Sequence, residues 1–379
     1  MSKASGRIRV AVESTALLTP RTGVGQMVTN LLTTLSARDD LEVSAFAVTL
    51  RGRGALAYEV PRHVRARTRH IPARLTRMLW RHLPIPRAEL WTGRVDIVHA
   101  PNFVAPPARA PVIATVHDLT FVWYPELSTP DTLTFPRYIQ LAIDRGAVLH
   151  VVSDFVASEV RDHFDIEPER VVRVYSGLVP SAGGDPARGR RLAGSDRYVL
   201  ALGTVEPRKN LPNLVKAFDA VAGDDPDLVL LVAGPDGWGV EDFDAAVDDA
   251  RHGERIRRLG YVDDHDRRDL LAGATVLAYP SIYEGFGHPP LEAMLSGIPV
   301  VASNAGALPE VLGDAALLPD PNDVDALAGA LHTVLSDGDV RAQLIARGHE
   351  RVKLYTWDRA GAEFADLYRQ VTEGGPANR

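Results

Sequence analysis

Residues 279–304 read YPSIYEGFGHPPLEAMLSGIPVVASN and combine a strand end, a glycine-rich loop, a short helix and a second strand. Glu284 and Glu292 lie in this stretch, separated by Pro289 and Pro290. Proline suits only the first turn of a helix, so one helix does not carry both glutamates. We therefore place Glu284 in the loop and Glu292 in the first turn of a helix that begins near Pro290.

The loop between the two glutamates has the properties of an anion site. Gly285 and Gly287 lack side chains, so the backbone N–H groups around them and Phe286 are able to approach a ligand closely. The N-terminus of the following helix adds a partial positive charge. A carboxylate on either side suits a nucleoside diphosphate that carries sugar hydroxyls. A glycine-rich turn with two surface glutamates is the plain structural alternative.

The complete string resembles the donor-site signature of retaining glycosyltransferase family 4, and the similarity is strongest over residues 198–304. Members of that family have the two-domain GT-B fold and transfer a sugar from a nucleoside diphosphate sugar to a hydroxyl acceptor. The resemblance implies that Glu292 binds the ribose hydroxyls and that Glu284 contacts donor-sugar hydroxyls near the anomeric carbon. It also implies that the backbone of the glycine loop holds the sugar and the phosphates.

Length and composition favour a globular chain of two domains. The chain has 379 residues, of which 45% are hydrophobic and 24% charged, and a single core of that size is uncommon. No apolar run approaches the ~20 residues of a membrane-spanning helix. Glu13 interrupts the apolar stretch after the basic N-terminus, so no secretory signal is expected. The absence of cysteine excludes disulfides and thiolate metal sites, and we expect a cytoplasmic protein.

Positive charge is concentrated in residues 60–88, although the formal net charge of −7 argues against nucleic-acid binding. The segment has no acidic residue and 8 arginines. Interleaved with them are the apolar residues Leu75, Met78, Leu79, Trp80 and Leu83. Two interpretations stay open: peripheral contact with an anionic membrane at its inner face or with a phosphorylated acceptor, or a solvated segment whose apolar residues pack on the domain.

Both halves of the chain alternate apolar runs with helical patterns, which is typical of parallel sheets covered on both faces. The predicted strands of the first half are 8–12, 43–49, 97–100, 112–116, 149–152 and 171–174. Those of the second half are 198–202, 228–232, 256–259, 276–279, 300–302 and 316–318. We therefore predict the α/β class and, with the resemblance, a GT-B fold whose two Rossmann-like domains face an interdomain cleft.

The first domain is predicted to span residues 1–177 and to serve the acceptor, and the second, residues 178–355, to bind the donor. Residues 177–197 are rich in Gly, Pro, Ala and Arg and show no helical or strand period, so we predict a linker there. A helical pattern runs from Trp357 to about Val371. In the resembled fold this terminal helix returns to the first domain, so residues 356–379 are assigned to it.

A glycine pair follows the first predicted strand. Residues 21–25 read RTGVG, before a helix predicted from Gln26 to about Leu35. A lone GxG suits a tight turn as well as an anion site. The resemblance implies that Gly23 and Gly25 border the acceptor and the donor phosphates.

His117 and Asp118 end another predicted strand of the first half. A histidine at a strand end is more often structural than catalytic. The resemblance implies instead that His117 contacts a hydroxyl of the donor sugar. It implies that Asp118 is an orienting or structural residue. Further along, Ser153 or Asp154 is expected only to cap a helix.

Residues 203–211 read GTVEPRKNL and follow the first strand of the second domain. Arg208 and Lys209 suit a diphosphate leaving group, whose negative charge grows as the glycosidic bond breaks. Many family members have an arginine directly after the glycine, where this chain has Thr204. Whether Arg208 replaces it, as in an EPRKN subgroup that resembles mannosyltransferases, stays open. A solvated pair of cations is the structural alternative.

The turn after the third strand of the second domain contains Tyr261 and Val262. The resemblance implies that their main-chain groups line the pocket of the base. Residues 263–266 read DDHD, which looks like a metal site but is expected to cap the next helix. No metal or other cofactor is expected, because Arg208, Lys209 and the helix start supply the positive charge.

These features predict a retaining, metal-independent hexosyltransferase. GDP-mannose is the favoured donor, with UDP- and dTDP-sugars open, and the expected acceptor is a hydroxyl of a glycan or lipid-linked saccharide. No second carboxylate partner for Glu284 stands out, so a same-face mechanism is expected, in which the leaving phosphate accepts the acceptor's proton. The alternatives are a GT-B sugar-nucleotide epimerase or phosphorylase, and a non-catalytic nucleotide-sugar-binding subunit, which Thr204 favours.

Overall fold

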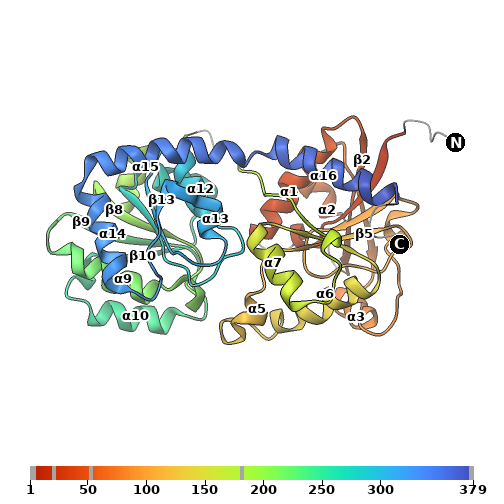
Figure 1. Ribbon diagram of the computed structural model, residues 1–379, viewed down its shortest axis with the longest axis horizontal. Coiled ribbons are helices and arrows are strands. Elements are labelled where there is room, and N and C mark those ends of the chain that lie inside the picture. The colour runs from red at the N-terminus through yellow and green to blue at the C-terminus, as the bar shows by residue number, and fades with distance from the viewer. Residues whose placement is uncertain (1–5, 19–22, 51–53, 180–182, 375–379) are drawn as a thin grey trace. The chain divides into compact units, whose positions relative to one another are not determined.

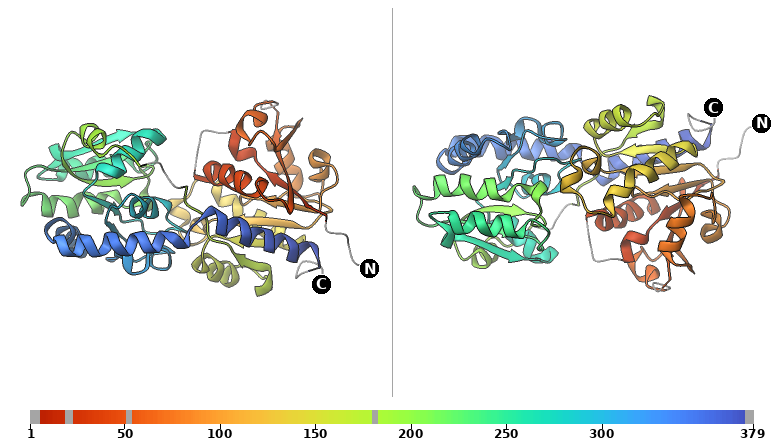
Figure 2. Two further views of the ribbon diagram at one scale, coloured as in Figure 1. Left: turned by 90° about the horizontal axis from the view of Figure 1, so that it is seen from above. Right: turned by 90° about the horizontal axis from the view of Figure 1, so that it is seen from below.

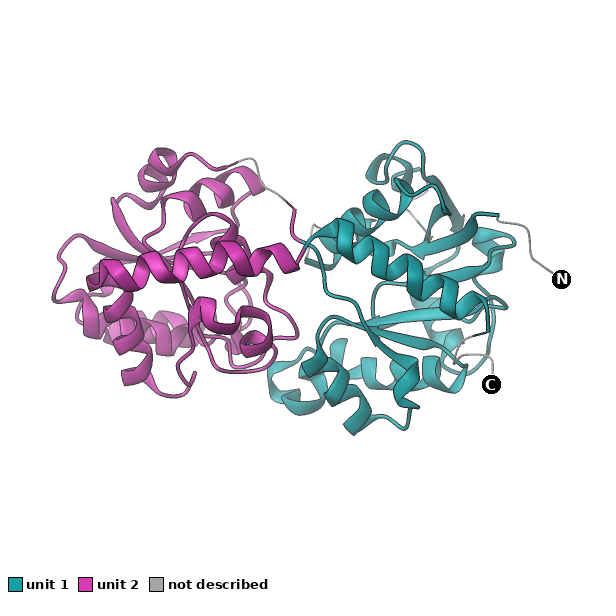
Figure 3. Ribbon diagram, turned by 45° about the horizontal axis from the view of Figure 1, so that its top comes forward, with its two compact units in different colours: residues 1–177, 356–379 teal, residues 178–355 magenta. Residues whose placement is uncertain are grey.

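The computed structural model describes residues 6–18, 23–50, 54–179 and 183–374. It divides into two compact units (Figure 3): unit 1 comprises residues 1–177 and 356–379, and unit 2 comprises residues 178–355. Each unit has its own parallel sheet flanked by helices, so the predicted α/β class with two Rossmann-like halves is confirmed. No described helix is both long and apolar enough to cross a membrane.

The sheet of unit 1 has the strand order β3-β2-β1-β4-β5-β6-β7, and every neighbouring pair is parallel. The strands are β1 (Ile8–Glu13), β2 (Leu41–Thr49), β3 (Arg65–His70), β4 (Ile97–Ala100), β5 (Val112–Val116), β6 (Val148–Val151) and β7 (Val171–Arg173). Strands β4 and β6 are buried along their whole length. Burial on both faces explains why these strands read as continuous apolar runs.

Helices cover both faces of this sheet (Figures 1 and 2). They are α1 (Gly23–Ser36), α2 (Leu56–Glu59), α3 (Ala73–Trp80), α4 (Glu89–Thr92), α5 (Thr120–Trp123), α6 (Phe135–Asp144), α7 (Asp154–His163) and α16 (Trp357–Thr372). The terminal helix α16 packs beside α1, where a Cβ on Gly361 would come within 2.4 Å of the Thr34 side chain. Ser153 caps α7, as expected, by accepting from the Val156 N–H.

The sheet of unit 2 has the order β10-β9-β8-β11-β12-β13, again parallel throughout. Its strands are β8 (Arg197–Leu202), β9 (Leu228–Ala233), β10 (Ile256–Gly260), β11 (Val276–Tyr279), β12 (Val300–Ala302) and β13 (Ala316–Leu317). Its helices are α8 (Pro186–Ala193), α9 (Leu211–Ala222), α10 (Val240–Asp249), α11 (Asp264–Gly273), α12 (His288–Leu295), α13 (Leu308–Leu312), α14 (Val324–Ser336) and α15 (Gly338–Arg351). The strand order reverses between β8 and β11. Ligands of open α/β sheets bind at such a point.

Two elements contradict the sequence prediction. Strand β3 was missed because its sequence, RARTRH, has no buried residue and lies at the edge of the sheet. Helix α8 occupies the middle of the predicted linker. Its signals are local: Asp185 accepts from the Ala187 N–H, Pro186 begins the helix, and Gly194 ends it in the left-handed conformation.

Two helices begin earlier than predicted. Helix α1 starts at Gly23 rather than Gln26, so Gly23 and Gly25 lie in its first turn and not in a loop before it. Helix α12 starts at His288 because Gly287, at φ 97°, turns the chain into it. Glu292 consequently lies in the second turn of α12, and not in the first.

A chain of buried polar groups crosses the sheet of unit 1. The Tyr368 hydroxyl of α16 lies 2.7 Å from His99 Nδ1, and His99 Nε2 lies 3.0 Å from the Thr115 hydroxyl. The same hydroxyl lies 2.9 Å from His150 Nδ1, and His150 Nε2 lies 3.0 Å from the Val174 carbonyl. Both histidines are almost completely buried.

Only one arrangement of hydrogens satisfies every group in this chain. The Val174 carbonyl only accepts, so His150 donates from Nε2 and, when neutral, accepts at Nδ1 from the Thr115 hydroxyl. His99 then donates from Nε2 to Thr115 and accepts from Tyr368. Burial lowers the pKa of His150 to about 3 and that of His99 well below its ordinary value. The docking of α16 on the sheet therefore requires two neutral histidines.

This requirement predicts a stability that falls in mild acid. Below a pH of about 6.5, the pKa of histidine in the unfolded chain, these histidines bind protons in the unfolded chain but stay neutral in the folded one. Each buried histidine therefore lowers the free energy of unfolding by up to about 1.4 kcal/mol per pH unit. Urea unfolding at pH 7, 6 and 5 measures the slope. His150→Gln should make it shallower, whereas His332→Gln, on an exposed histidine, should not. An unchanged slope in His150→Gln would contradict this account.

Candidate donor site in unit 2

Two loops of unit 2 meet where the strand order reverses. The loop after β8 contains Arg208 and Lys209 in the short 3₁₀ turn η5 (Pro207–Lys209), and the loop after β11 contains Glu284. Because β8 and β11 are parallel neighbours, their carboxyl ends lie at the same edge of the sheet. The Ile282 N–H donates to the Arg208 carbonyl at 2.9 Å, which ties the two loops together.

Asn210 and two glycines set the path of the first loop. Asn210 has φ 56°, and its side-chain amide donates to the Pro280 carbonyl at 3.2 Å and to the Pro321 carbonyl at 2.7 Å. Gly203 and Gly234 pass so closely that a Cβ on Gly234 would come within 2.0 Å of the Gly203 carbonyl oxygen. The loop is therefore fixed by backbone contacts before its cations are considered.

The cations of the first loop bind the carboxylate of the second. Lys209 Nζ lies 2.7 Å from Glu284 Oε1 and 2.7 Å from the Tyr279 hydroxyl. Arg208 Nη1 lies 2.9 Å from Glu284 Oε2, and Arg208 also donates to Glu206 at 2.7 Å and to the Tyr283 carbonyl at 2.9 Å. The Glu284 side chain is only 10% exposed. Two cations thus share one buried carboxylate.

The charges of this cluster depend on one another. Burial alone would raise the pKa of Glu284, but Arg208 and Lys209 outweigh it and lower the pKa to about 2. Burial also lowers the pKa of Lys209, an effect that Glu284 opposes, and burial next to Glu284 raises the pKa of Tyr279 well above its usual range. Glu284 is therefore an anion throughout the physiological range.

The glycine loop after Glu284 is held against its own helix and against a second loop. Phe286 is buried, with its ring 5.5 Å from that of Tyr355 in an edge-to-face contact. Gly287 caps α12 and Gly285 precedes Phe286. Gly306 has φ 59°, and a Cβ there would come within 2.5 Å of the Glu284 carbonyl oxygen. The Ala307 N–H donates to that oxygen at 2.8 Å.

Glu292 is paired with a residue that the sequence did not single out. Its carboxylate accepts from Arg267 of α11, and a quarter of its side chain is exposed. Tyr261 and Val262 follow β10, two strands from β8 in the order of the sheet. Tyr261 is 68% exposed. Glu284, Lys209 and Arg208 are in direct contact, whereas the carboxylate of Glu292 is paired with Arg267.

The remaining predicted site residues belong to unit 1. His117 follows β5 and is half-buried, and its Nε2 lies 2.9 Å from the Pro101 carbonyl. A carbonyl only accepts, so Nε2 carries the hydrogen and, in the neutral ring, Nδ1 accepts. Burial lowers the pKa of His117, which keeps the ring neutral. Gly25 is buried and Gly23 exposed at the start of α1, while Arg21 and Thr22 lie outside the described residues.

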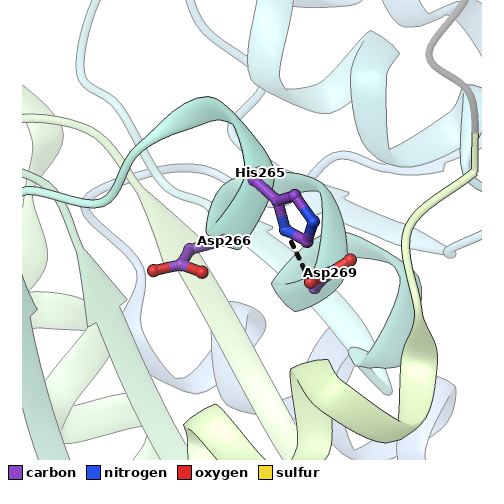
Figure 4. A group of neighbouring side chains, drawn as sticks. All are labelled: His265, Asp266 and Asp269. Carbon is purple, nitrogen blue, oxygen red and sulfur yellow. Dashed lines mark ion pairs between the residues drawn. The ribbon is translucent and has the colours of Figure 1, made fainter.

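The DDHD segment does cap a helix, as expected. Asp263 accepts from the His265 and Asp266 N–H groups at the start of α11. Figure 4 shows His265, Asp266 and Asp269 gathered on that helix, with their ligand-type atoms within 4.8 Å of one another. The Arg188 guanidinium of α8 donates to all three side chains. A protein cation therefore already binds this cluster.

Sequence reasoning missed three partners in unit 2: Glu206, Tyr279 and Arg267. Glu206 and Tyr279 lie within the two loop motifs, but nothing in their spacing shows which cation they contact. Arg267 lies outside every motif. Arg267 is the fourth residue of α11, and this helix starts at the same sheet edge as the loops after β8 and β11. That position is a weak indication that Arg267 lies near the candidate site.

Comparison with known proteins follows the same division of the chain. Residues 187–351 match the family described as glycosyl transferases group 1, and residues 21–182 match glycosyltransferase family 4. O-antigen chain mannosyltransferase B of Escherichia coli is 34% identical over 295 residues, which cover 75% of this chain and 77% of that protein.

Two solved structures share the fold. Sucrose-phosphate synthase of Thermosynechococcus elongatus has a TM-score of 0.77 at 22% identity, covering 97% of this chain and 100% of that one. HepE of Anabaena, in complex with UDP and glucose, has a TM-score of 0.73 at 16% identity, covering 96% and 100%. The predicted GT-B fold is confirmed.

The contact of Gly306 with the Glu284 backbone yields a prediction. Gly306→Ala should lower the free energy of unfolding of unit 2 by about 2–4 kcal/mol, because it combines a left-handed backbone with a clash in a packed loop. Gly260→Ala is the matched control in the same unit: its φ is 70°, but no atom lies within 4 Å of the added Cβ. It should cost about 1 kcal/mol. Equal losses in urea unfolding would show that the contact is unimportant.

Proposed function

Because this chain belongs to the glycosyltransferases of group 1 and family 4, we propose that it transfers a mannosyl group from GDP-mannose to a hydroxyl of a glycan or lipid-linked saccharide, with retention at the anomeric carbon. The likeness to the Escherichia coli O-antigen mannosyltransferase supports the sugar and the class of acceptor. The UDP and glucose in the Anabaena structure support a nucleoside diphosphate sugar as donor.

The observation that carries this proposal is that Lys209 and Arg208 both contact the carboxylate of Glu284. Two partly buried cations at the point where a parallel sheet reverses its strand order suit a diphosphate. Lys209 Nζ has three hydrogens, and within the described part of the chain two of them are used, by Glu284 and Tyr279. The third is available to a phosphate oxygen. Glu284 offsets the repulsion between the cations until the donor binds.

Each proposed donor contact uses a group already oriented by the fold. Lys209 and Arg208 bind the diphosphate, and Arg208, bonded to Glu206, also holds Glu284 in position. Glu284 accepts hydrogen bonds from hydroxyls of the donor sugar. Backbone N–H groups of residues 285–287, at the start of α12, face the sugar and the phosphates.

The nucleoside is assigned to the neighbouring loops. Glu292 accepts from the ribose hydroxyls while Arg267 holds its second oxygen, since a carboxylate has capacity for both. Main-chain groups of Tyr261 and Val262 line the base. In unit 1, the hydrogen on Nε2 of His117 leaves Nδ1 to accept a hydrogen bond from a sugar hydroxyl, and Gly23 and Gly25 are assigned to the acceptor and phosphates.

The proposed reaction breaks the bond between the anomeric carbon and the phosphate oxygen and forms a bond from the acceptor oxygen on the same face. The proton of the acceptor hydroxyl passes to the leaving phosphate oxygen, so no protein base is needed. Lys209, Arg208 and the start of α12 stabilise the negative charge of the departing diphosphate. We propose that these groups make a metal ion unnecessary.

This function predicts separable effects of two substitutions. Lys209→Met should weaken GDP binding at least tenfold, because a charge-assisted hydrogen bond contributes about 1.5–3 kcal/mol. Glu284→Gln should lower mannosyl transfer more than a hundredfold while GDP binding stays measurable. Lys216→Met, on an exposed lysine of α9, is the control. Calorimetry measures GDP binding, and an assay of transfer from GDP-mannose measures activity. Unchanged GDP affinity in Lys209→Met would show that Lys209 is not part of the donor site.

Three further measurements test the donor base, the anomeric configuration of the product and the need for a metal ion. Thermal shifts with GDP-, UDP-, dTDP- and ADP-sugars should be largest for GDP-mannose, and NMR of the product should show the donor's anomeric configuration. EDTA should leave the rate unchanged. A larger shift with another base, an inverted product, or a rate lost to EDTA and restored by Mg²⁺ would each overturn the corresponding part. Product that forms without acceptor would favour an epimerase.

We also propose that the segment 60–88 contacts an anionic membrane at its inner face. Helix α3 is held by the buried Thr76 and Trp80, while Leu75 and Met78 on the same helix are 46% and 53% exposed. The following residues Leu83 and Ile85 are 46% and 52% exposed. Exposed apolar side chains among arginines suit a headgroup interface.

Cosedimentation with vesicles tests this contact. Leu75→Ser/Met78→Ser should lower the fraction bound to vesicles containing phosphatidylglycerol severalfold, because it removes the apolar side chains that insert. Leu133→Ser/Leu354→Ser, at residues 44% and 40% exposed elsewhere, should not. Equal binding by both variants would return α3 to a role in packing alone.

A further inference from the structure

A cavity of about 270 Å³ opens in unit 1 at the amino end of the sheet. Its charged and ionisable lining is unusually basic: Arg7, Arg9, Glu42, His63, Arg65, Arg67 and Arg94. Arg9 is near the start of β1, Arg65 begins β3, and Arg94 lies three residues before β4. His117 and the glycines of α1 follow the opposite, carboxyl ends of the strands. This cavity is therefore separate from every residue assigned to sugar transfer in unit 1.

The register of the strands explains why these arginines converge. Arg9 pairs with Glu42, Ser44 with Arg65, and Phe46 with Arg67, and paired residues of parallel strands point to the same face. That face carries the apolar cluster of Phe46, Trp80 and Trp91. The cavity lies beyond the end of α4, where a Cβ on Gly93 would lie 3.7 Å from Arg67 Nη1.

The positive charge of the cavity exceeds the negative charge around it. Arg9 is neutralised by Asp96 at 2.6 Å, and Arg7 lies 3.6 Å from Asp39. Among the residues that the structure describes, Arg65, Arg67 and Arg94 form no ion pair. Arginines on an edge strand also discourage strand pairing with other chains. That explanation covers β3 alone and does not extend to Arg94, which lies in the turn after α4.

We infer that this cavity is a second anion site, which binds a diphosphate or a pair of neighbouring phosphate groups. Three guanidinium groups that form no ion pair within the described residues, with Arg94 sharing the neighbourhood of Asp96, match the charge and the planar hydrogen-bonding geometry that phosphate oxygens require. Such a ligand relieves the repulsion among arginines that the strand register forces together. The phosphates belong either to a soluble compound or to a lipid headgroup.

Calorimetry with inorganic pyrophosphate tests the site, using full-length protein that carries Lys209→Met so that the proposed donor site contributes little. Arg65→Gln/Arg67→Gln should weaken binding at least tenfold. Arg62→Gln/Arg74→Gln removes the same charge at exposed arginines outside the cavity and should change binding less than twofold. Equal weakening by both pairs, or none by the first, would overturn the proposal, whatever Lys209→Met does to GDP binding.

Stability without ligand distinguishes a binding role from a structural one. Arginines that exist to bind an anion repel one another when it is absent, so Arg65→Gln/Arg67→Gln should leave the melting temperature unchanged or raise it. Pyrophosphate should raise the melting temperature of the parent chain and not that of the variant. A variant that melts several degrees lower without ligand would show instead that the arginines support the fold.

Vesicles identify the source of the phosphate. If a lipid headgroup binds, the Arg65→Gln/Arg67→Gln pair lowers binding to phosphatidylglycerol vesicles, and pyrophosphate displaces the parent chain from them. If a soluble compound binds, pyrophosphate binding depends on the pair but vesicle binding does not. Both outcomes support the site. If Arg65→Gln/Arg67→Gln changes neither pyrophosphate binding nor vesicle binding, the proposed site is contradicted.

Discussion

The pairing of Glu284 with Lys209 and Arg208 is the interaction on which the unit-2 site depends. It joins the loops after β8 and β11 and places three charges where solvent screens them poorly. Removing one partner of such a buried group costs about 3–5 kcal/mol, because the remaining charges stay buried without compensation. In the proposed function, the same contacts respond to the donor, since its diphosphate is a second anion for cations that one carboxylate now shares.

The parallel sheets explain where the polar groups lie. Strand β9 is buried along its whole length and carries no charged side chain, whereas arginines occur along the edge strand β3. In unit 2 the carboxyl edge carries the cations and glutamates of the candidate donor site. In unit 1 the carboxyl edge carries His117, whereas the amino edge gathers the arginines of the second anion site. Opposite edges of one sheet are thus suited to different ligands.

The sequence predicted the interior strands well, since continuous apolar runs bounded by turns have few other structures open to them. Strand β3 was missed because an edge strand of alternating arginines buries no apolar residue. Helix α8 was missed because the composition around it is typical of a linker, although Asp185, Pro186 and Gly194 provide its caps. The starts of α1 and α12 were placed too late, because the glycines of α1 were assigned to a loop and α12 was begun near Pro290 and not at His288.

The residue types that we propose for donor binding were singled out from the sequence, because glutamates, adjacent cations and glycines in one order indicate that chemistry by their spacing. Their partners were not, because a hydrogen bond depends on strand register and helix packing, which bring distant residues together. Glu206 on Arg208, Arg267 on Glu292 and Arg188 on the His265 cluster are each products of that packing. The convergence of Arg9, Arg67 and Arg94 is the clearest case: unremarkable apart in the chain, they become one basic cavity only when three parallel strands align.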